Sequence, residues 1–188
     1  MSDRVHRKRA TVATARKRTS AGAQPRLLDI YLNDHLAGAN GGVDLARRLA
    51  QEHRETAVGE ALEPFAVEVA EDRAALLEIM DALGIAVSRM KACTAWILEK
   101  FGRLKPNGRF LERSPLSSLV ELEAMRLGVE GKAAGWRTLR MLAAHDSRID
   151  DRRLGTLLAR ARRQARLLEE LHAQIAETSI TAKWLRPK

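Results

Sequence analysis

Residues 26–53, RLLDIYLNDHLAGANGGVDLARRLAQEH, indicate the class of fold most directly. Apolar or small residues recur at 28, 32, 35/36, 39, 42, 45/46 and 49, which is the spacing of one face of an α-helix. The composition agrees, because alanine, leucine, arginine and glutamate are abundant whereas only 4% of the 188 residues are aromatic. The sequence therefore predicts an all-α protein whose first long helix ends near His53.

A second helix is expected over residues 61–83. Pro64 would lie in its first turn, where the missing N–H does no harm, and Gly84 would follow its last residue as a C-terminal glycine. One face of this helix is apolar and consists of Phe65, Val69, Leu76, Ile79 and Leu83.

Two more long helices are expected toward the C-terminus. The third opens on Ser114-Pro115, an N-cap followed by a proline at the first helical position, and continues to about Ala144. The fourth is capped by Asp150 or Asp151 and ends near Thr178. The predicted apolar face of the third helix is Leu116, Leu119, Val120, Leu127, Ala134 and Met141, and that of the fourth is Leu154, Leu157, Leu158, Ala161, Ala165, Leu168, Leu171 and Ile175.

The connections between these helices are short, long and short. The long one, residues 84–114, contains a shorter amphipathic stretch and then the turn-rich KPNGRFLERS. A long second connection lets the chain cross the bundle, so that the third helix runs parallel to the second, which is the ferritin-like order. We therefore expect a four-helix bundle with a helix-containing crossover; alternatively, the short helix packs as a fifth member of the core.

Charge separates an amino-terminal arm from the rest of the chain. Residues 1–26 hold eight basic side chains and one acidic side chain, so they carry +7 of the net charge of +9. We expect residues 1–25 to form a basic disordered arm, 26–178 the bundle domain and 179–188 a tail. The arm offers an anionic partner, such as nucleic acid or an acidic surface, the side chains of Arg4, Arg7, Lys8, Arg9, Arg16, Lys17 and Arg18.

Cysteine usage and hydropathy indicate the compartment. Cys93 is the single cysteine, so it cannot form an internal disulfide, and no run of about 18 uncharged apolar residues is present. We therefore expect no transmembrane segment and a cytoplasmic location.

Polar residues interrupt the apolar faces of the four predicted helices. A di-metal site in a bundle needs carboxylates and histidines that project inward at matching depth, often as Glu-x-x-His pairs. Residues 169–172, Glu-Glu-Leu-His, form one such pair. The candidate metal ligands are Asp34, His35, Glu68, Asp72, Glu123, Glu130 and His172.

In this pattern, over roughly residues 27–177, the chain resembles the ferritin-like four-helix-bundle superfamily. More loosely, it is similar to uncharacterised helical proteins of high-GC bacteria that carry a run like LNDHLAGANGGVDLARR, here residues 32–48. The resemblance implies a bundle that holds Fe or Mn for redox chemistry or storage. The helix over 61–83 contains no histidine, however, so one of the two expected Glu-x-x-His pairs is missing.

Three functions follow from these patterns. Carboxylates in helix faces commonly pair with arginines such as Arg73, Arg126 and Arg137, so we first expect a non-enzymatic interaction or structural module, as a monomer or a homodimer. The second is a metal-binding oxidoreductase or storage protein, and the third is an anionic-surface or nucleic-acid binder that uses the arm.

Glycines in the predicted first and third helices are the remaining unusual feature. Each costs about 0.5–1 kcal/mol relative to alanine inside a helix, and close helix approach is the simplest compensation. They are Gly38, Gly41, Gly42, Gly128, Gly131 and Gly135.

Overall fold

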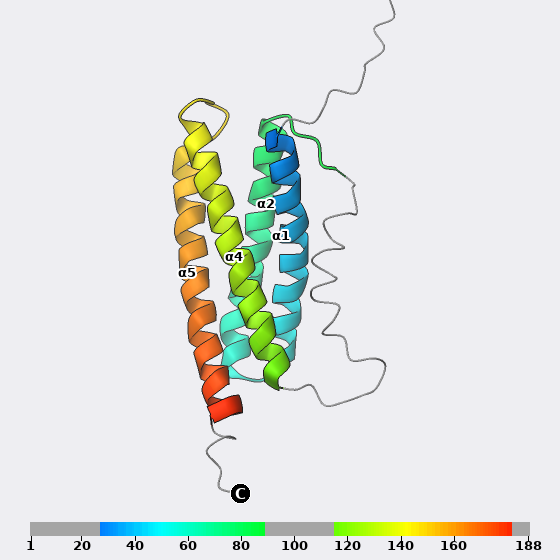
Figure 1. Ribbon diagram of the computed structural model, residues 1–188, viewed down its shortest axis with the longest axis vertical. Coiled ribbons are helices and arrows are strands. Elements are labelled where there is room, and N and C mark those ends of the chain that lie inside the picture. Colours follow the sequence, from blue (N-terminus) through cyan, green and yellow to red (C-terminus); the bar gives the residue numbers. More distant parts are fainter. Residues whose placement is uncertain (1–26, 89–114, 182–188) are drawn as a thin grey trace, which may run out of the picture.

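The computed structural model describes residues 27–88 and 115–181 (Figure 1). These residues form four long helices and no strand: α1 Leu27–Glu52, α2 Ala57–Ala82, α4 Pro115–Ala143 and α5 Asp151–Ala176. A single π-helical turn, Glu177–Thr181, follows α5. The all-α, four-helix prediction is confirmed, whereas the arm, the short helix of the long connection, Cys93 and residues 182–188 lie outside the described residues.

Side-chain contacts give the directions of the helices. Tyr31 meets Thr138 and His53 meets Ser118, so α1 and α4 are antiparallel. The pairs α1–α2, α4–α5 and α2–α5 are antiparallel as well. Of the four neighbouring pairs, α2 and α5 pack least closely. It follows that α2 and α4 run in the same direction at diagonal corners of the bundle.

The core runs the length of the bundle and draws on all four helices. The apolar faces predicted for the second and fourth helices are buried in α2 and α5 throughout. The largest completely buried apolar side chains are Leu32, Leu49, Leu62, Phe65, Met80, Leu122, Val129, Leu139, Leu154 and Leu168. None of the described helices contains an apolar stretch long enough to cross a membrane.

The start of α2 differs from the prediction. The helix begins at Ala57 rather than 61, because the hydroxyl of Thr56 accepts a hydrogen bond from the backbone N–H of Gly59 and caps the helix. Pro64 consequently lies in the helix interior and not in its first turn.

The end of α2 is as predicted. Gly84 has φ of +70°, and its N–H donates to the carbonyl of Asp81 while that of Ile85 donates to Met80. These two bonds form a Schellman motif, which requires the left-handed conformation that glycine adopts without strain.

The buried face of α4 is not the one that the sequence predicted. Leu127 is 74% exposed and Met141 is 68% exposed, so the predicted apolar face points largely outward. A second row of apolar side chains on α4 is buried instead. It contains the bulkiest residue of the helix, Trp136, which is 3% exposed, so its burial removes more apolar surface from water. That row is Leu119, Leu122, Met125, Val129, Ala133, Trp136 and Leu139.

The amino end of α5 settles the alternative between two caps. The carboxylate of Asp150 accepts hydrogen bonds from the backbone N–H groups of Arg152 and Arg153, at 2.9 and 3.1 Å. Asp150 is therefore the N-cap, and Asp151 is the first helical residue.

Candidate functional site

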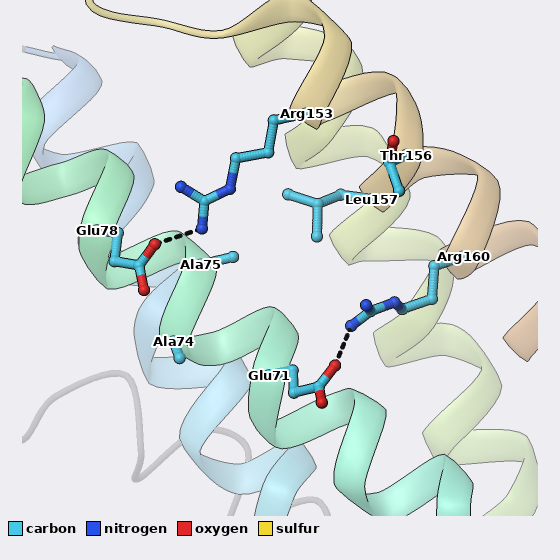
Figure 2. Close-up of a pocket in the computed structure, with 8 residues that line it drawn as sticks. All are labelled: Glu71, Ala74, Ala75, Glu78, Arg153, Thr156, Leu157 and Arg160. Atoms are coloured by element: carbon cyan, nitrogen blue, oxygen red, sulfur yellow. Dashed lines mark hydrogen bonds and ion pairs between the residues drawn. The ribbon is translucent and has the colours of Figure 1, made fainter.

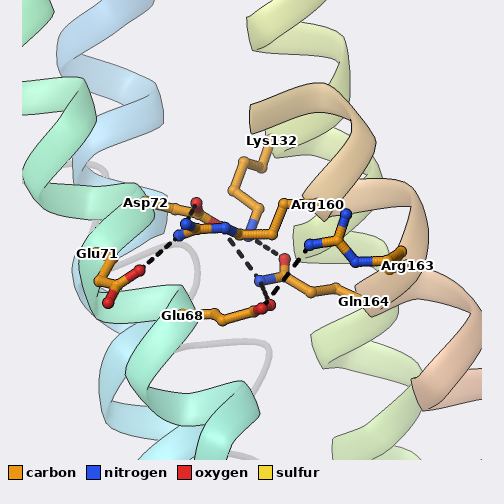
Figure 3. A network of polar contacts seen from close by, with 7 residues as sticks. All are labelled: Glu68, Glu71, Asp72, Lys132, Arg160, Arg163 and Gln164. Carbon is orange, nitrogen blue, oxygen red and sulfur yellow. Dashed lines mark hydrogen bonds and ion pairs between the residues drawn. The ribbon is translucent and has the colours of Figure 1, made fainter. Parts of the chain in front are cut away.

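A polar cluster interrupts the core between α2, α4 and α5 (Figure 3). Asp72 is its innermost carboxylate, with 1% of its surface exposed, and Gln164 is 2% exposed. The polar cluster consists of Glu68, Glu71 and Asp72 from α2, Lys132 from α4, and Arg160, Arg163 and Gln164 from α5.

Both oxygens of Asp72 accept hydrogen bonds. Lys132 Nζ lies 2.6 Å from Oδ2 of Asp72, and Nε2 of Gln164 lies 3.3 Å from the same oxygen. Arg160 Nη1 lies 3.2 Å from Oδ1. A buried carboxylate is tolerated in a core only when it is paired and hydrogen-bonded in this way.

The amide of Gln164 connects the remaining members of the polar cluster. Its oxygen accepts a hydrogen bond from Lys132 Nζ at 2.6 Å, and its nitrogen donates to Oε2 of Glu68 at 2.9 Å. Gln164 thus gives the ammonium group a second acceptor and ties Asp72 to Glu68.

The charges of the polar cluster balance. Three carboxylates face one ammonium and two guanidinium groups, since Arg160 also binds Glu71 at 2.8 Å and Arg163 lies 3.9 Å from Glu68. Burial lowers the pKa of Lys132, and the adjacent Asp72 carboxylate opposes that shift. The ammonium group of Lys132 is therefore the cation at the centre of a neutral network.

A groove of about 410 Å³ adjoins the polar cluster between α2 and α5 (Figure 2). Ion pairs between Arg153 and Glu78 and between Arg160 and Glu71 bridge it. Ala74, Ala75, Thr156 and Leu157 complete its lining. All four charged groups of this groove are therefore already neutralised within the chain.

The structure brings some predicted metal ligands together and separates others. Glu68 and Asp72 both belong to the polar cluster and share Gln164. Glu123 and His172 form a separate pair, with Oε1 and Nε2 3.0 Å apart. Glu130 is exposed on α4. The prediction that Glu123 and Glu130 point inward was wrong, because the α4 face that they share is largely exposed.

The two candidates on α1 lie away from the polar cluster. Asp34 is exposed, whereas His35 is partly buried and lies edge-on to Tyr31, with ring centroids 4.5 Å apart. A Cβ on Gly135 would lie 3.2 Å from Cε1 of His35, so this glycine allows the imidazole to approach α4. Burial lowers the pKa of His35, and Asp34 partly opposes the shift.

The described residues contain no group of three or more His, Cys, Asp or Glu side chains placed to hold a metal ion. The chemistry of the donor set explains why the deepest candidate, Asp72, is not part of one. Its nearest polar neighbours are an ammonium, a guanidinium and an amide NH₂, all of which are hydrogen-bond donors and not metal ligands.

Sequence reasoning did not find Lys132, Arg160 or Gln164. Gln164 had a usable signal, because it interrupts the buried face of α5 between Ala161 and Leu168. Lys132 had none: it follows Gly131 at the edge of the α4 face, and only the packing of α4 against α5 brings its ammonium to Asp72.

Comparison with known protein families, curated proteins and solved structures finds no significant match to this chain.

Proposed function

We propose that this chain is a non-enzymatic helical-bundle module that acts as a structural element or through interaction with a partner. The main support for the proposal is the hydrogen bonding of Asp72. Its two carboxylate oxygens accept hydrogen bonds from Lys132, Arg160 and Gln164. Such a network holds three helices in register and gives both carboxylate oxygens of Asp72 a partner within the chain.

The Lys132 ammonium supplies the positive charge that a metal ion would supply in a bundle of this kind. A divalent cation at Asp72 would have to displace an ammonium that lies 2.6 Å from the carboxylate and 2.6 Å from the Gln164 oxygen. It would also add charge to a network that is already neutral. Both effects oppose metal uptake at the polar cluster.

Elemental analysis of the purified chain after exposure to Fe, Mn and Zn tests the proposal. A double variant, Asp72→Ala with Glu123→Ala, is measured alongside the parent. We expect no stoichiometric metal in either protein. One or two ions per parent chain that are lost in the variant would overturn the proposal in favour of a metal-binding bundle.

We further propose that the bundle has the ferritin-like order of helices. The parallel directions of α2 and α4 support this, because a chain that leaves α2 at one end must enter α4 at the other. A crystal structure in which residues 89–114 travel the length of the bundle is the expected result. A domain-swapped dimer, in which α4 and α5 of one chain pack against α1 and α2 of another, would contradict the proposed order.

A second candidate is binding to an anionic surface. Four exposed arginines of α4 and α5 form no ion pair with another described side chain: Arg137, Arg152, Arg162 and Arg166. The other three arginines of α5, Arg153, Arg160 and Arg163, are turned toward carboxylates of α2. Guanidinium groups without partners suit phosphate contacts that weaken with salt.

Deletion of residues 1–24 and the triple change of Arg152, Arg162 and Arg166 to Gln test this candidate separately. Binding to duplex DNA and to acidic vesicles at low salt is the readout. Loss on deletion alone would assign the activity to the arm, and loss in the triple variant would extend it to α5. Unchanged binding in both variants would contradict this candidate.

A further inference from the structure

Two opposite sides of the bundle are built differently. On the α1–α4 side, glycines let the helices come close: a Cβ on Gly42 would lie 3.6 Å from Cε of Met125. A Cβ on Gly135 would likewise lie 3.2 Å from Cε1 of His35. On the α2–α5 side, in contrast, the two helices pack least closely of the four neighbouring pairs. We call the part of this side between residues 71–78 of α2 and 153–160 of α5 the seam (Figure 2).

Arginine side chains of α5 bridge the seam at both ends. Arg160 binds Glu71 at 2.8 Å and also reaches the buried Asp72, so this end is joined to the polar cluster. At the other end Arg153 forms an ion pair with Glu78, and the two side chains are 43% and 61% exposed. The second ion pair therefore lies in water, whereas the first is anchored to the core.

The groove between these two ion pairs reaches the hydrophobic core. Ala75 and Leu157 line it, and both belong to the core, with 5% and 6% of their surface exposed. Long charged side chains, rather than close packing of the helices, thus cover this part of the core. Breaking an exposed ion pair costs little, because both charges regain water, whereas separating α1 from α4 would expose closely packed apolar surface. The seam is therefore the side of the bundle that separates most easily.

We propose that the bundle opens at the Arg153 end of the seam while α1 and α4 stay packed against each other, and that salt promotes this opening. Salt screens exposed charges, whereas it does not weaken apolar packing. The hydrogen bond between Arg160 and the buried Asp72 limits the opening, because a buried carboxylate that loses a partner is costly. The open state gives solvent access to Ala75 and Leu157, which the closed bundle keeps buried. The seam thus acts as a salt-sensitive gate to the core.

The reactivity of a single cysteine in the groove tests the proposal. The full chain carries Ala75→Cys, and Cys93→Ser removes its only native cysteine. Iodoacetamide is the reagent, because it is uncharged and salt does not act on it directly. Between about 0.05 M and 1 M NaCl the labelling rate should rise about threefold, the factor expected for the loss of one exposed ion pair. The control Ala46→Cys, at a completely buried position one turn after Gly42 on α1, should show no rise.

Charge reversal separates the ion pair from other effects of salt. In the Ala75→Cys chain at low salt, Arg153→Glu should raise the labelling rate at least as much as high salt does, because it places two carboxylates opposite each other. The addition of Glu78→Arg should return the rate close to that of the parent. Arg140→Glu is the matched control, since its ion pair with Asp151 is 42% and 55% exposed but joins the closely packed helices α4 and α5. It should leave the labelling rate unchanged.

Two results would overturn the proposal. The first is a labelling rate at Ala75→Cys that neither salt nor charge reversal changes. The second is an equal rise at Ala46→Cys, which would mean that the whole bundle unfolds and not that the seam opens. Because elemental analysis concerns metal uptake at the polar cluster and labelling concerns the seam, either proposal can fail while the other stands.

Discussion

The Nζ atom of Lys132 lies 2.6 Å from Oδ2 of Asp72, and this contact joins α4 to α2 across the diagonal of the bundle. Diagonal helices in a four-helix bundle share little backbone contact, so their relative register depends on side chains that reach the centre. Asp72 and Lys132 are 1% and 17% exposed, and Gln164 makes a hydrogen bond to each of them. This pair is the natural first target for mutation.

Lys132→Met is expected to destabilise the fold by about 3 kcal/mol, because it leaves the Asp72 carboxylate buried with one cation fewer. Unfolding by urea measures the change. The double variant with Asp72→Asn should recover part of the loss. In the control Arg126→Met, which removes an exposed ion pair with Glu169, the cost should stay below about 1 kcal/mol. Equal losses in both single variants would contradict a structural role for the polar cluster.

His35 is expected to make stability depend on pH. Burial lowers the pKa of His35 below 6.5, so in the window just below 6.5 the unfolded chain binds more protons than the folded chain. Stability should therefore fall as the pH drops through that window and should be insensitive to this group above it. Urea unfolding from pH 5 to 8 should show a shallower slope for His35→Phe than for the parent. His145→Gln, a change of an exposed histidine, is the matched control.

Gly59→Ala should be strongly destabilising, by about 3 kcal/mol or more, because an added Cβ would lie 2.0 Å from the carbonyl oxygen of His53. To relieve this clash the backbone between His53 and Gly59 would have to move, which would break the hydrogen bond that caps α2 at Thr56. Gly38→Ala makes the same chemical change in mid-helix, where a Cβ has no atom within 4 Å, and should stabilise by about 0.5–1 kcal/mol. Thermal melts that rank the two variants in the opposite order would refute this account.

Replacing the internal cation should create a metal site. Lys132→Met combined with Gln164→Glu removes the ammonium and adds a carboxylate beside Glu68 and Asp72, which gives a hard anionic donor set. A Kd near 0.2 mM would stabilise this variant by about 1 kcal/mol in 1 mM Mn²⁺. The parent should not respond to Mn²⁺ in the same melts. An equal rise in melting temperature for both proteins would mean that the Lys132 ammonium does not take the position that a metal ion would occupy.

The number, extent and caps of the helices follow closely from local sequence. Gly84 ends α2 in the left-handed conformation, and Asp150 caps α5, because both effects involve groups within five residues of each other. The start of α2 lies four residues before the predicted one, because Thr56 caps the helix there. This cap is also a local feature, and it outweighs the indication given by Pro64. Of the candidate site, the sequence identified Asp72 and Glu68 by their interruption of an apolar face.

Periodicity and capping act along one helix, so local sequence is enough to specify an all-α chain with four long helices and the buried faces of α2 and α5. The buried face of α4, in contrast, depends on packing between helices, because both rows are apolar. Trp136 is buried and Leu127 is exposed only once α1 and α5 pack against the helix. The partner of Asp72 likewise depends on packing. Lys132 lies 60 residues away, and only the direction of α4 brings its ammonium to the carboxylate.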